Sequence, residues 1–106
     1  MSWADFAIKT LQSGQVATIT PHGNSMKGKV NSGDTVILSP AKENQLEKGD
    51  IVLVKVKGNV YLHLITAING SRFLIGNNKG GTNGWVGVSA IFGVATTVEG
   101  KIIKRI

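Results

Sequence analysis

The sequence contains no cysteine, only two prolines and only two histidines among its 106 residues. Without cysteine the chain can form no disulfide, no thiolate nucleophile and no cysteine-based zinc site. The six acidic residues are scattered, so no set of side chains has the spacing of metal ligands. We therefore expect neither a metal nor a cofactor. With so little proline, the turns must depend mainly on the 14 glycines.

Long apolar runs are also missing. No stretch approaches the roughly 20 consecutive apolar residues that a membrane-spanning helix needs. The first residues have neither the basic nor the apolar region of a signal peptide. We expect a soluble, cytoplasmic protein. A hydrophobic content of 42% with 17% charged residues is typical of a globular chain, and this length suits one domain, residues 1–106.

Acidic residues are outnumbered by basic ones, six to twelve, which gives a net charge of +6. Such an excess favours anionic partners, so a basic nucleic-acid-binding β-domain is one alternative function. The signal is weak, because the basic residues are spread along the chain and so are the aromatic residues that would stack on bases. The one basic cluster, residues 101–105, is interpreted as a solvated, fraying terminus.

Turn signals divide the chain into a short helix followed by strands. Residues 1–14 are predicted to form the helix, with Ser2 as its cap, and residues 15–98 a β core. The strands are expected at residues 16–20, 35–38, 51–57, 60–68, 72–75 and 88–98. Two dipeptides, Gly58-Asn59 and Asn69-Gly70, are hairpin signals. The glycine-rich segment 76–87 is predicted to be a loop, and residues 99–106 a basic tail that adds at most a short edge strand.

One pattern occurs twice within about 20 residues: a Gly-Asp pair that leads directly into a strand. The pairs are Gly33-Asp34 and Gly49-Asp50. Glycine supplies an unusual backbone angle, and the aspartate side chain can hydrogen-bond to nearby backbone groups. Two copies so close together indicate one structural element that the fold uses twice.

The segment Pro-His-Gly-Asn-Ser-Met, residues 21–26, is the main candidate for chemistry. Gly23 permits a sharp turn, which can expose the Ser25 hydroxyl and direct backbone N–H groups into the same space, as an oxyanion hole requires. A serine hydroxyl is a poor nucleophile unless a base accepts its proton. The structural alternative is that Ser25 caps a short helix beginning at Met26.

Two histidines compete for the role of base. His63 lies in the predicted strand 60–68, on the same face as Tyr61 and Ile65. A histidine is mostly neutral at pH 7 and can accept a hydroxyl proton. The alternative for His63 is a half-buried side chain bonded to backbone. His22 is nearer to Ser25 in sequence, but we expect the tight turn to direct it away.

Four motifs occur in a fixed order: the Gly-x-Ser-Met turn, the two Gly-Asp turns, the strand with His63, and a Gly-x-Ala strand at residues 93–95. Together they span residues 15–98, and the chain resembles the peptidase domain shared by signal peptidases and LexA-type self-cleaving repressors. The resemblance implies a mostly β domain, in which a coiled, partly barrel-like antiparallel sheet is joined by a short N-terminal helix.

The resemblance also implies roles. Ser25 would attack a peptide carbonyl, and His63 would be the base, as in the Ser-His branch of archaeal and endoplasmic-reticulum signal peptidases rather than the serine–lysine branch. The oxyanion turn would consist of Gly23, Asn24, Ser25 and Met26. The predicted function is that of a small serine endopeptidase acting on a peptide or protein substrate.

The chain departs from the Ser-His branch in its acids. No Asp or Glu occurs between Asp50 and Glu99. Where the family has Gly-Asp-Asn after the base strand, this chain has Gly76-Asn77-Asn78, so Asn77 is the candidate group to orient His63. Loss of an orienting acid slows related triads by orders of magnitude. A catalytically silent binding module with the peptidase fold is therefore a further alternative.

Overall fold

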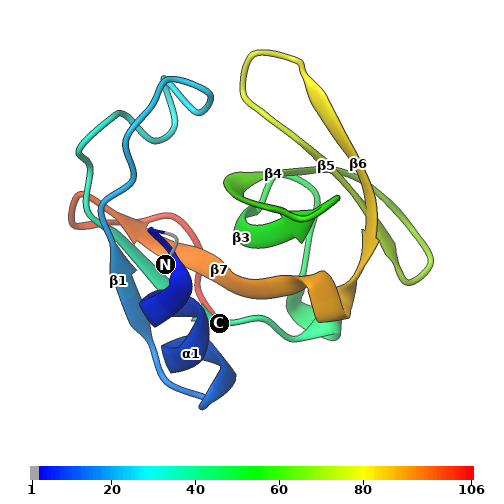
Figure 1. The fold of residues 1–106 in the computed structure, drawn as a ribbon, viewed down its shortest axis with the longest axis horizontal. Coiled ribbons are helices and arrows are strands. Elements are labelled where there is room, and N and C mark those ends of the chain that lie inside the picture. The colour runs from blue at the N-terminus through cyan, green and yellow to red at the C-terminus, as the bar shows by residue number, and fades with distance from the viewer. Residues whose placement is uncertain (1–2) are drawn as a thin grey trace.

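The computed structural model describes residues 3–106 as one helix and a curled antiparallel sheet (Figure 1). Strands hold 44% of the residues and helices 13%, and the sheet forms a half-barrel, which confirms the predicted fold class. The strands are β1 (Ala17–Ile19), β2 (Val36–Pro40), β3 (Ile51–Val56), β4 (Asn59–Asn69), β5 (Arg72–Gly76), β6 (Thr82–Gly87), β7 (Ile91–Val98) and β8 (Lys101–Ile102). The helix is α1 (Asp5–Gln12), and two 3-10 turns are η1 (Glu43–Gln45) and η2 (Val88–Ala90).

The order of strands in the sheet is β1-β2-β7-β3-β4-β5-β6, and β8 pairs with β7. The five strands predicted before residue 76 are all present, with ends that differ by no more than two residues. The loop predicted at residues 76–87 is wrong in its second half, because residues 82–87 form β6 and pair with β5. The glycines of this segment favoured a loop in the prediction, whereas backbone hydrogen bonds to β5 make residues 82–87 a strand. The predicted strand 88–98 begins with η2 and becomes β7 at Ile91.

Both faces of β3 are buried, because the sheet curls around two separate cores. Ile51 and Leu53 belong to a first core with α1, β1 and β2. Val52, Val54 and Val56 point the other way, into a second core with β5 and β6. Successive side chains of a strand alternate between its faces, so one strand can serve both cores. Packing on both faces therefore holds the β3–β4 pair in place, and with it the side chains of β4.

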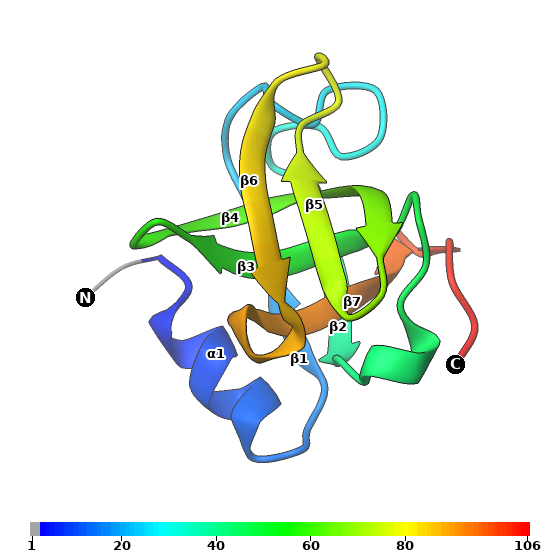
Figure 2. The same ribbon diagram turned by 90° about the vertical axis from the view of Figure 1, so that its right-hand side faces the viewer.

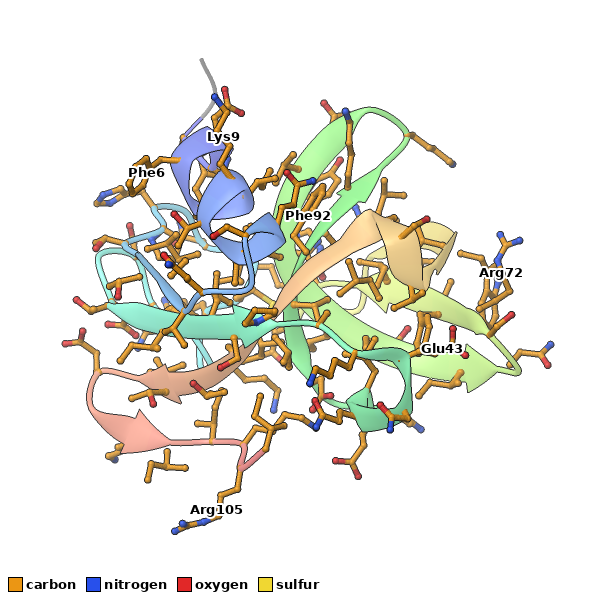
Figure 3. The ribbon with its side chains drawn as sticks, turned by 90° about the horizontal axis from the view of Figure 1, so that it is seen from below. Phe6, Lys9, Glu43, Arg72, Phe92 and Arg105 are labelled. Atoms are coloured by element: carbon orange, nitrogen blue, oxygen red, sulfur yellow. The ribbon has the colours of Figure 1, made fainter. Side chains whose placement is uncertain are left out.

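Helix α1 packs on the first core through Ala7 and Leu11, with Ala4 buried at the position before its first residue. The predicted cap, Ser2, lies outside the described residues. Phe6 and Lys9 lie on the outer side of the helix (Figure 3). No helix within residues 3–106 is long and apolar enough to cross a membrane.

The two Gly-Asp turns have the same construction. The Asp34 carboxylate accepts the N–H of Asn31 at 2.8 Å, and the Asp50 carboxylate accepts the N–H of Glu47 at 2.8 Å. Both bonds span three residues, and the glycine before each aspartate has a positive φ, +88° at Gly33 and +95° at Gly49. The repeat seen in the sequence is therefore one turn used before β2 and again before β3.

The C-terminal segment is anchored, which corrects its interpretation as a fraying terminus. Lys104 Nζ lies 2.9 Å from Glu47 Oε1 and 3.0 Å from Asp50 Oδ2, and its side chain is only 8% exposed. Burial by itself lowers the pKa of Lys104, but the hydrogen bonds and charges of the two carboxylates outweigh it and raise the pKa. The tail thus closes over the second Gly-Asp turn, although Arg105 points outward (Figure 3).

Gly93 is required where α1 crosses β7. A Cβ at this position would lie 2.8 Å from Leu11 Cδ1 and 3.0 Å from the backbone oxygen of Ser39. We expect Gly93→Ala to lower the free energy of unfolding by about 1–3 kcal/mol, because the crowding forces the helix away from the strand. Urea unfolding followed by tryptophan fluorescence measures the change.

Gly87→Ala is the matched control. Gly87 has a φ of −88°, and a Cβ added there would meet no atom within 4 Å. Its replacement should leave stability unchanged or raise it by up to about 1 kcal/mol, because alanine restricts the unfolded chain. Equal destabilisation by both variants would contradict the packing explanation.

Candidate active site

The candidate nucleophile lies on a sharp turn after β1, here called the serine turn (residues 23–30). Gly23 begins it with a φ of +130°, a conformation that side-chain-bearing residues rarely adopt. The N–H of Gly23 donates to Ser32 Oγ at 3.2 Å, and the N–H of Lys27 donates to the Asn24 carbonyl at 3.1 Å. Residues 24–30 form turns rather than a helix, so Ser25 does not cap a helix.

Met26 anchors the serine turn in the first core. Its side chain is buried together with that of Val30, and the N–H of Val30 donates to the Met26 carbonyl at 2.8 Å. The two apolar side chains hold the turn down while Ser25, the residue before Met26, stays half-exposed. The motif therefore combines a flexible glycine, a polar residue at the surface and an apolar anchor.

The structure brings Ser25 and His63 together. Ser25 Oγ lies 3.0 Å from His63 Nε2, although the two residues are 38 positions apart in the chain. His63 lies on β4 opposite Val52 of β3, and it is 5% exposed. The rigid β3–β4 pair thus fixes the histidine, and the serine turn brings the hydroxyl to it.

Asn83 of β6 supports His63 from the other side. Asn83 Oδ1 lies 2.7 Å from His63 Nδ1. An amide oxygen can only accept a hydrogen bond, so the neutral ring carries its proton on Nδ1. The lone pair of Nε2 is then directed at the Ser25 hydroxyl, which is the tautomer that a general base needs.

The structure gives Asn83, rather than Asn77, the place beside His63. Asn77 Oδ1 accepts the N–H groups of Lys79 and Gly81, each at 2.9 Å, and so folds the tip of the β5–β6 hairpin (residues 77–81). Asn83 was not predicted from the sequence, because residues 76–87 were assigned to a loop. The only available signal was an amide side chain in a segment without acids.

The hairpin tip also holds the serine turn. The N–H of Asn78 donates to the Ser25 carbonyl at 2.9 Å, and Asn78 Nδ2 donates to the Lys27 carbonyl at 2.9 Å. Figure 2 shows the hairpin crossing β3 and β4, with its tip at the same end of the molecule as the serine turn. One hairpin therefore positions both members of the Ser25–His63 pair.

The surroundings of His63 keep the ring neutral. Burial lowers the pKa of His63 below the ordinary value of 6.5, and the hydrogen bond to Asn83 opposes this only in part. The ring of Tyr61 stacks on the imidazole, with the ring centres 4.7 Å apart and the planes inclined by 21°. A neutral histidine at pH 7 is able to accept a proton from Ser25.

A cleft of about 410 Å³ opens beside Ser25 and His63. One wall comes from residues 20–26 and the other from residues 60–63 of β4, with Trp3, which is 54% exposed, also lining the cleft. His22 is exposed at the surface and is also among the residues that line this cleft. The hydrogen-bond partner of the Ser25 hydroxyl is nevertheless His63, whose Nε2 accepts. Within residues 3–106, no group of three or more His, Cys, Asp or Glu side chains is placed to hold a metal.

The curled antiparallel sheet, with a turn serine against a strand histidine, has the fold that the resemblance to the peptidase superfamily implied. A comparison with protein families agrees: the model of the family described as Peptidase S24-like matches residues 3–95. The chain therefore belongs to the peptidase S24-like family, within the superfamily of LexA-type repressors and signal peptidases. A search of the curated proteins finds no match.

The environment of His63 can be tested by titration. We expect the pKa of His63, followed by NMR of its ring protons, to lie below 6.5 in the wild type because of burial. Asn83→Asp should raise this pKa by roughly 1 unit or more, because a carboxylate beside Nδ1 stabilises the imidazolium.

Asn83→Leu is the matched control and should lower the pKa further, because the leucine removes the hydrogen bond from Asn83 that raises it. A His63 pKa that is the same in all three proteins would contradict the contact between Asn83 and His63.

Proposed function

We propose that this protein is a serine endopeptidase in which Ser25 is the nucleophile and His63 the general base. The observation that carries the proposal is the 3.0 Å contact between Ser25 Oγ and His63 Nε2 at the edge of a cleft. Membership of a peptidase family supports it. The tautomer that Asn83 selects also supports it, because it leaves Nε2 free to accept.

The reaction follows from these positions. Ser25 Oγ attacks the carbonyl carbon of the scissile bond while His63 Nε2 takes the hydroxyl proton. The imidazolium then gives this proton to the leaving amine, which departs and leaves an acyl group on Ser25. A water molecule, deprotonated by His63, attacks the acyl carbon and releases the second product.

The backbone of the serine turn would stabilise the oxyanion. We assign this role to the N–H of Ser25, which is not among the donors that fold the described turn. The predicted oxyanion set included Gly23, Asn24 and Met26. Of these, Gly23 is excluded as an oxyanion donor, because its N–H already donates to Ser32 Oγ. A backbone N–H aimed at the developing charge is typically worth a factor of about 10² or more in rate.

The residue that orients His63 is an amide, Asn83, and this determines the rate of cleavage that we expect. In Ser-His-Asp triads the aspartate both orients the histidine and stabilises the imidazolium that forms. Asn83 performs the first task through Oδ1 but supplies no charge for the second. We therefore expect a slow enzyme, suited to one or a few cleavages rather than to bulk turnover.

An exposed strand edge offers a place for the substrate backbone. Residues 60–63 of β4 pair with β3 on one side, whereas β5 begins to pair with β4 only at Leu64. The remaining edge of residues 60–63 borders the cleft, opposite residues 20–23. An extended peptide can add to such an edge by main-chain hydrogen bonds, which places a carbonyl beside Ser25.

A catalytically silent peptide-binding module is the second candidate. The observation that favours it is again Asn83, since the site has no carboxylate to stabilise an imidazolium. Labelling separates the two. A serine-directed phosphonate probe should modify the wild type at Ser25, as read by mass spectrometry, and absence of any adduct would favour the silent module.

Substitution of the pair provides the main test of catalysis. Ser25→Ala and His63→Ala should each lower peptide cleavage by about 10³-fold or more, because they remove the nucleophile or its base. Cleavage of a peptide library, detected by mass spectrometry as new termini, measures the effect. Ser71→Ala is the matched control for loss of a hydroxyl, since Ser71 is exposed in the β4–β5 turn. His22→Ala tests the competing histidine and should retain cleavage.

The pH dependence follows from the direction of the His63 pKa. Only the neutral ring can accept the proton, so kcat/KM should rise with pH and level off once the pH passes a pKa that lies below 6.5. Asn83→Asp should move this rise to higher pH and increase the plateau, because its carboxylate stabilises the imidazolium in the transition state. A rise that stays in place in Asn83→Asp would argue against His63 as the base.

A further inference from the structure

The carboxylates of this chain avoid the segments that form the cleft. Residues 6–33 and 51–98 contain no Asp or Glu, and these segments supply the serine turn, both cleft walls at Ser25 and the β5–β6 hairpin. Glu47 and Asp50 are paired with Lys104. Asp34 accepts the N–H of Asn31, which lines the cleft, so this carboxylate lies next to the cleft without lining it. Glu43 lies in η1, outside these segments, and is labelled in Figure 3.

Three exposed lysines lie on the two segments that meet at Ser25, although none of the three lines the cleft itself. Lys27 and Lys29 are exposed on the serine turn, and Lys79 is exposed on the hairpin tip. Asn78 joins these two segments, because it binds the carbonyls of Ser25 and Lys27 and immediately precedes Lys79. Three cations thus belong to the two segments that are joined beside Ser25. In the described chain, both salt bridges belong to Lys104, at a distance in sequence from this rim.

The other end of the cleft has a different character. A second hollow continues from the first past Val60 and Tyr61, and both Asp5 and Lys55 line it. Charges of both signs meet there, so this end has no electrostatic preference of one sign. The unbalanced lysines are therefore those of the serine turn and the hairpin tip.

A peptide fits these observations better than a nucleic acid. The groove beside Ser25 is lined by Met26, Val30 and Leu62, with an open strand edge along residues 60–63. Such a groove suits an extended backbone with apolar side chains. Of Tyr61 and Trp3, which both line the cleft, Tyr61 is already stacked on the imidazole, and this leaves Trp3 as the exposed ring that could stack on a base.

We propose that the cleft selects peptides that carry acidic residues on the side of the scissile bond that passes Lys27, Lys29 and Lys79. The proposal rests on the proposed peptidase function and specifies its substrate class. Exposed lysines around a cleft raise the local concentration of an anionic ligand and are screened by salt over about 10 Å at 0.1 M. The preference should therefore be clear at low ionic strength and weak at high ionic strength.

Three peptide pools test the proposal. Each pool has the same randomised central segment, flanked on both sides by acidic, neutral or basic residues. Wild-type protein is assayed for cleavage by mass spectrometry, and Ser25→Ala protein for retention of uncut peptides. We expect the acidic pool to exceed the neutral pool by about tenfold in both assays at about 50 mM salt, and this ratio to approach one at about 500 mM.

Charge reversal locates the effect. The triple variant Lys27→Glu, Lys29→Glu, Lys79→Glu should abolish the acidic-over-neutral ratio. The matched control is Lys42→Glu, Lys48→Glu, Lys101→Glu, which changes the net charge equally at exposed positions outside the serine turn and the hairpin tip, and it should keep the ratio. Thermal unfolding of both triple variants verifies that they are folded. If a triple variant does not fold, the single variants Lys27→Glu and Lys79→Glu are tested in its place.

Each outcome bears on a different statement. Cleavage without an acidic preference overturns the substrate class and leaves the peptidase. Retention of acidic peptides by Ser25→Ala without cleavage by the wild type overturns the peptidase and keeps the ligand class. If an oligonucleotide binds the Ser25→Ala protein more tightly than the acidic peptides do, and displaces them, the ligand is a nucleic acid and not a peptide. Absence of both cleavage and acidic preference overturns both proposals.

Discussion

The docking of the β5–β6 hairpin onto the serine turn is the contact on which the site depends. Asn78 ties the hairpin tip to the carbonyls of Ser25 and Lys27, and Asn83 of the same hairpin binds His63. Each neutral hydrogen bond contributes only about 1 kcal/mol. The hairpin is held in place mainly by its apolar side chains in the second core, among them Phe73 and Ile75. The geometry at Ser25 therefore depends on packing on the far side of the sheet.

The curl of the sheet explains how so short a chain builds this site. Because β3 is buried on both faces, β4 is supported along its paired edge and can leave residues 60–63 unpaired on the other edge. An open edge in the middle of a well-packed sheet is rigid without being covered. The cleft occupies this gap, and His63 lies at its floor, where burial holds the ring neutral.

Much of the fold was predictable because it depends on local patterns. Alternating side chains and turn dipeptides located the strands up to residue 76 to within two positions, and the repeated Gly-Asp pairs proved to be one turn used twice. The prediction failed at β6, where five glycines in residues 76–87 suggested a loop. Gly84 in that strand has a φ of +143°, a strained geometry for other residues, and the ladder with β5 overrides the weak strand propensity of the segment.

The sequence by itself determined the candidate nucleophile, the candidate base and the lack of a nearby acid, because these are matters of residue type and order. Only the tertiary structure decided which side chain hydrogen-bonds to Nδ1 of His63. Nothing in the chain marks Asn83 over Asn77, since both are amides in one glycine-rich segment, and their roles differ through the register of β6 against β5. The same is true of Lys104, whose buried ammonium group pairs with carboxylates more than 50 residues away in the chain. Side chains distant in sequence meet only when the sheet closes, so the orientation of His63 is a property of the fold.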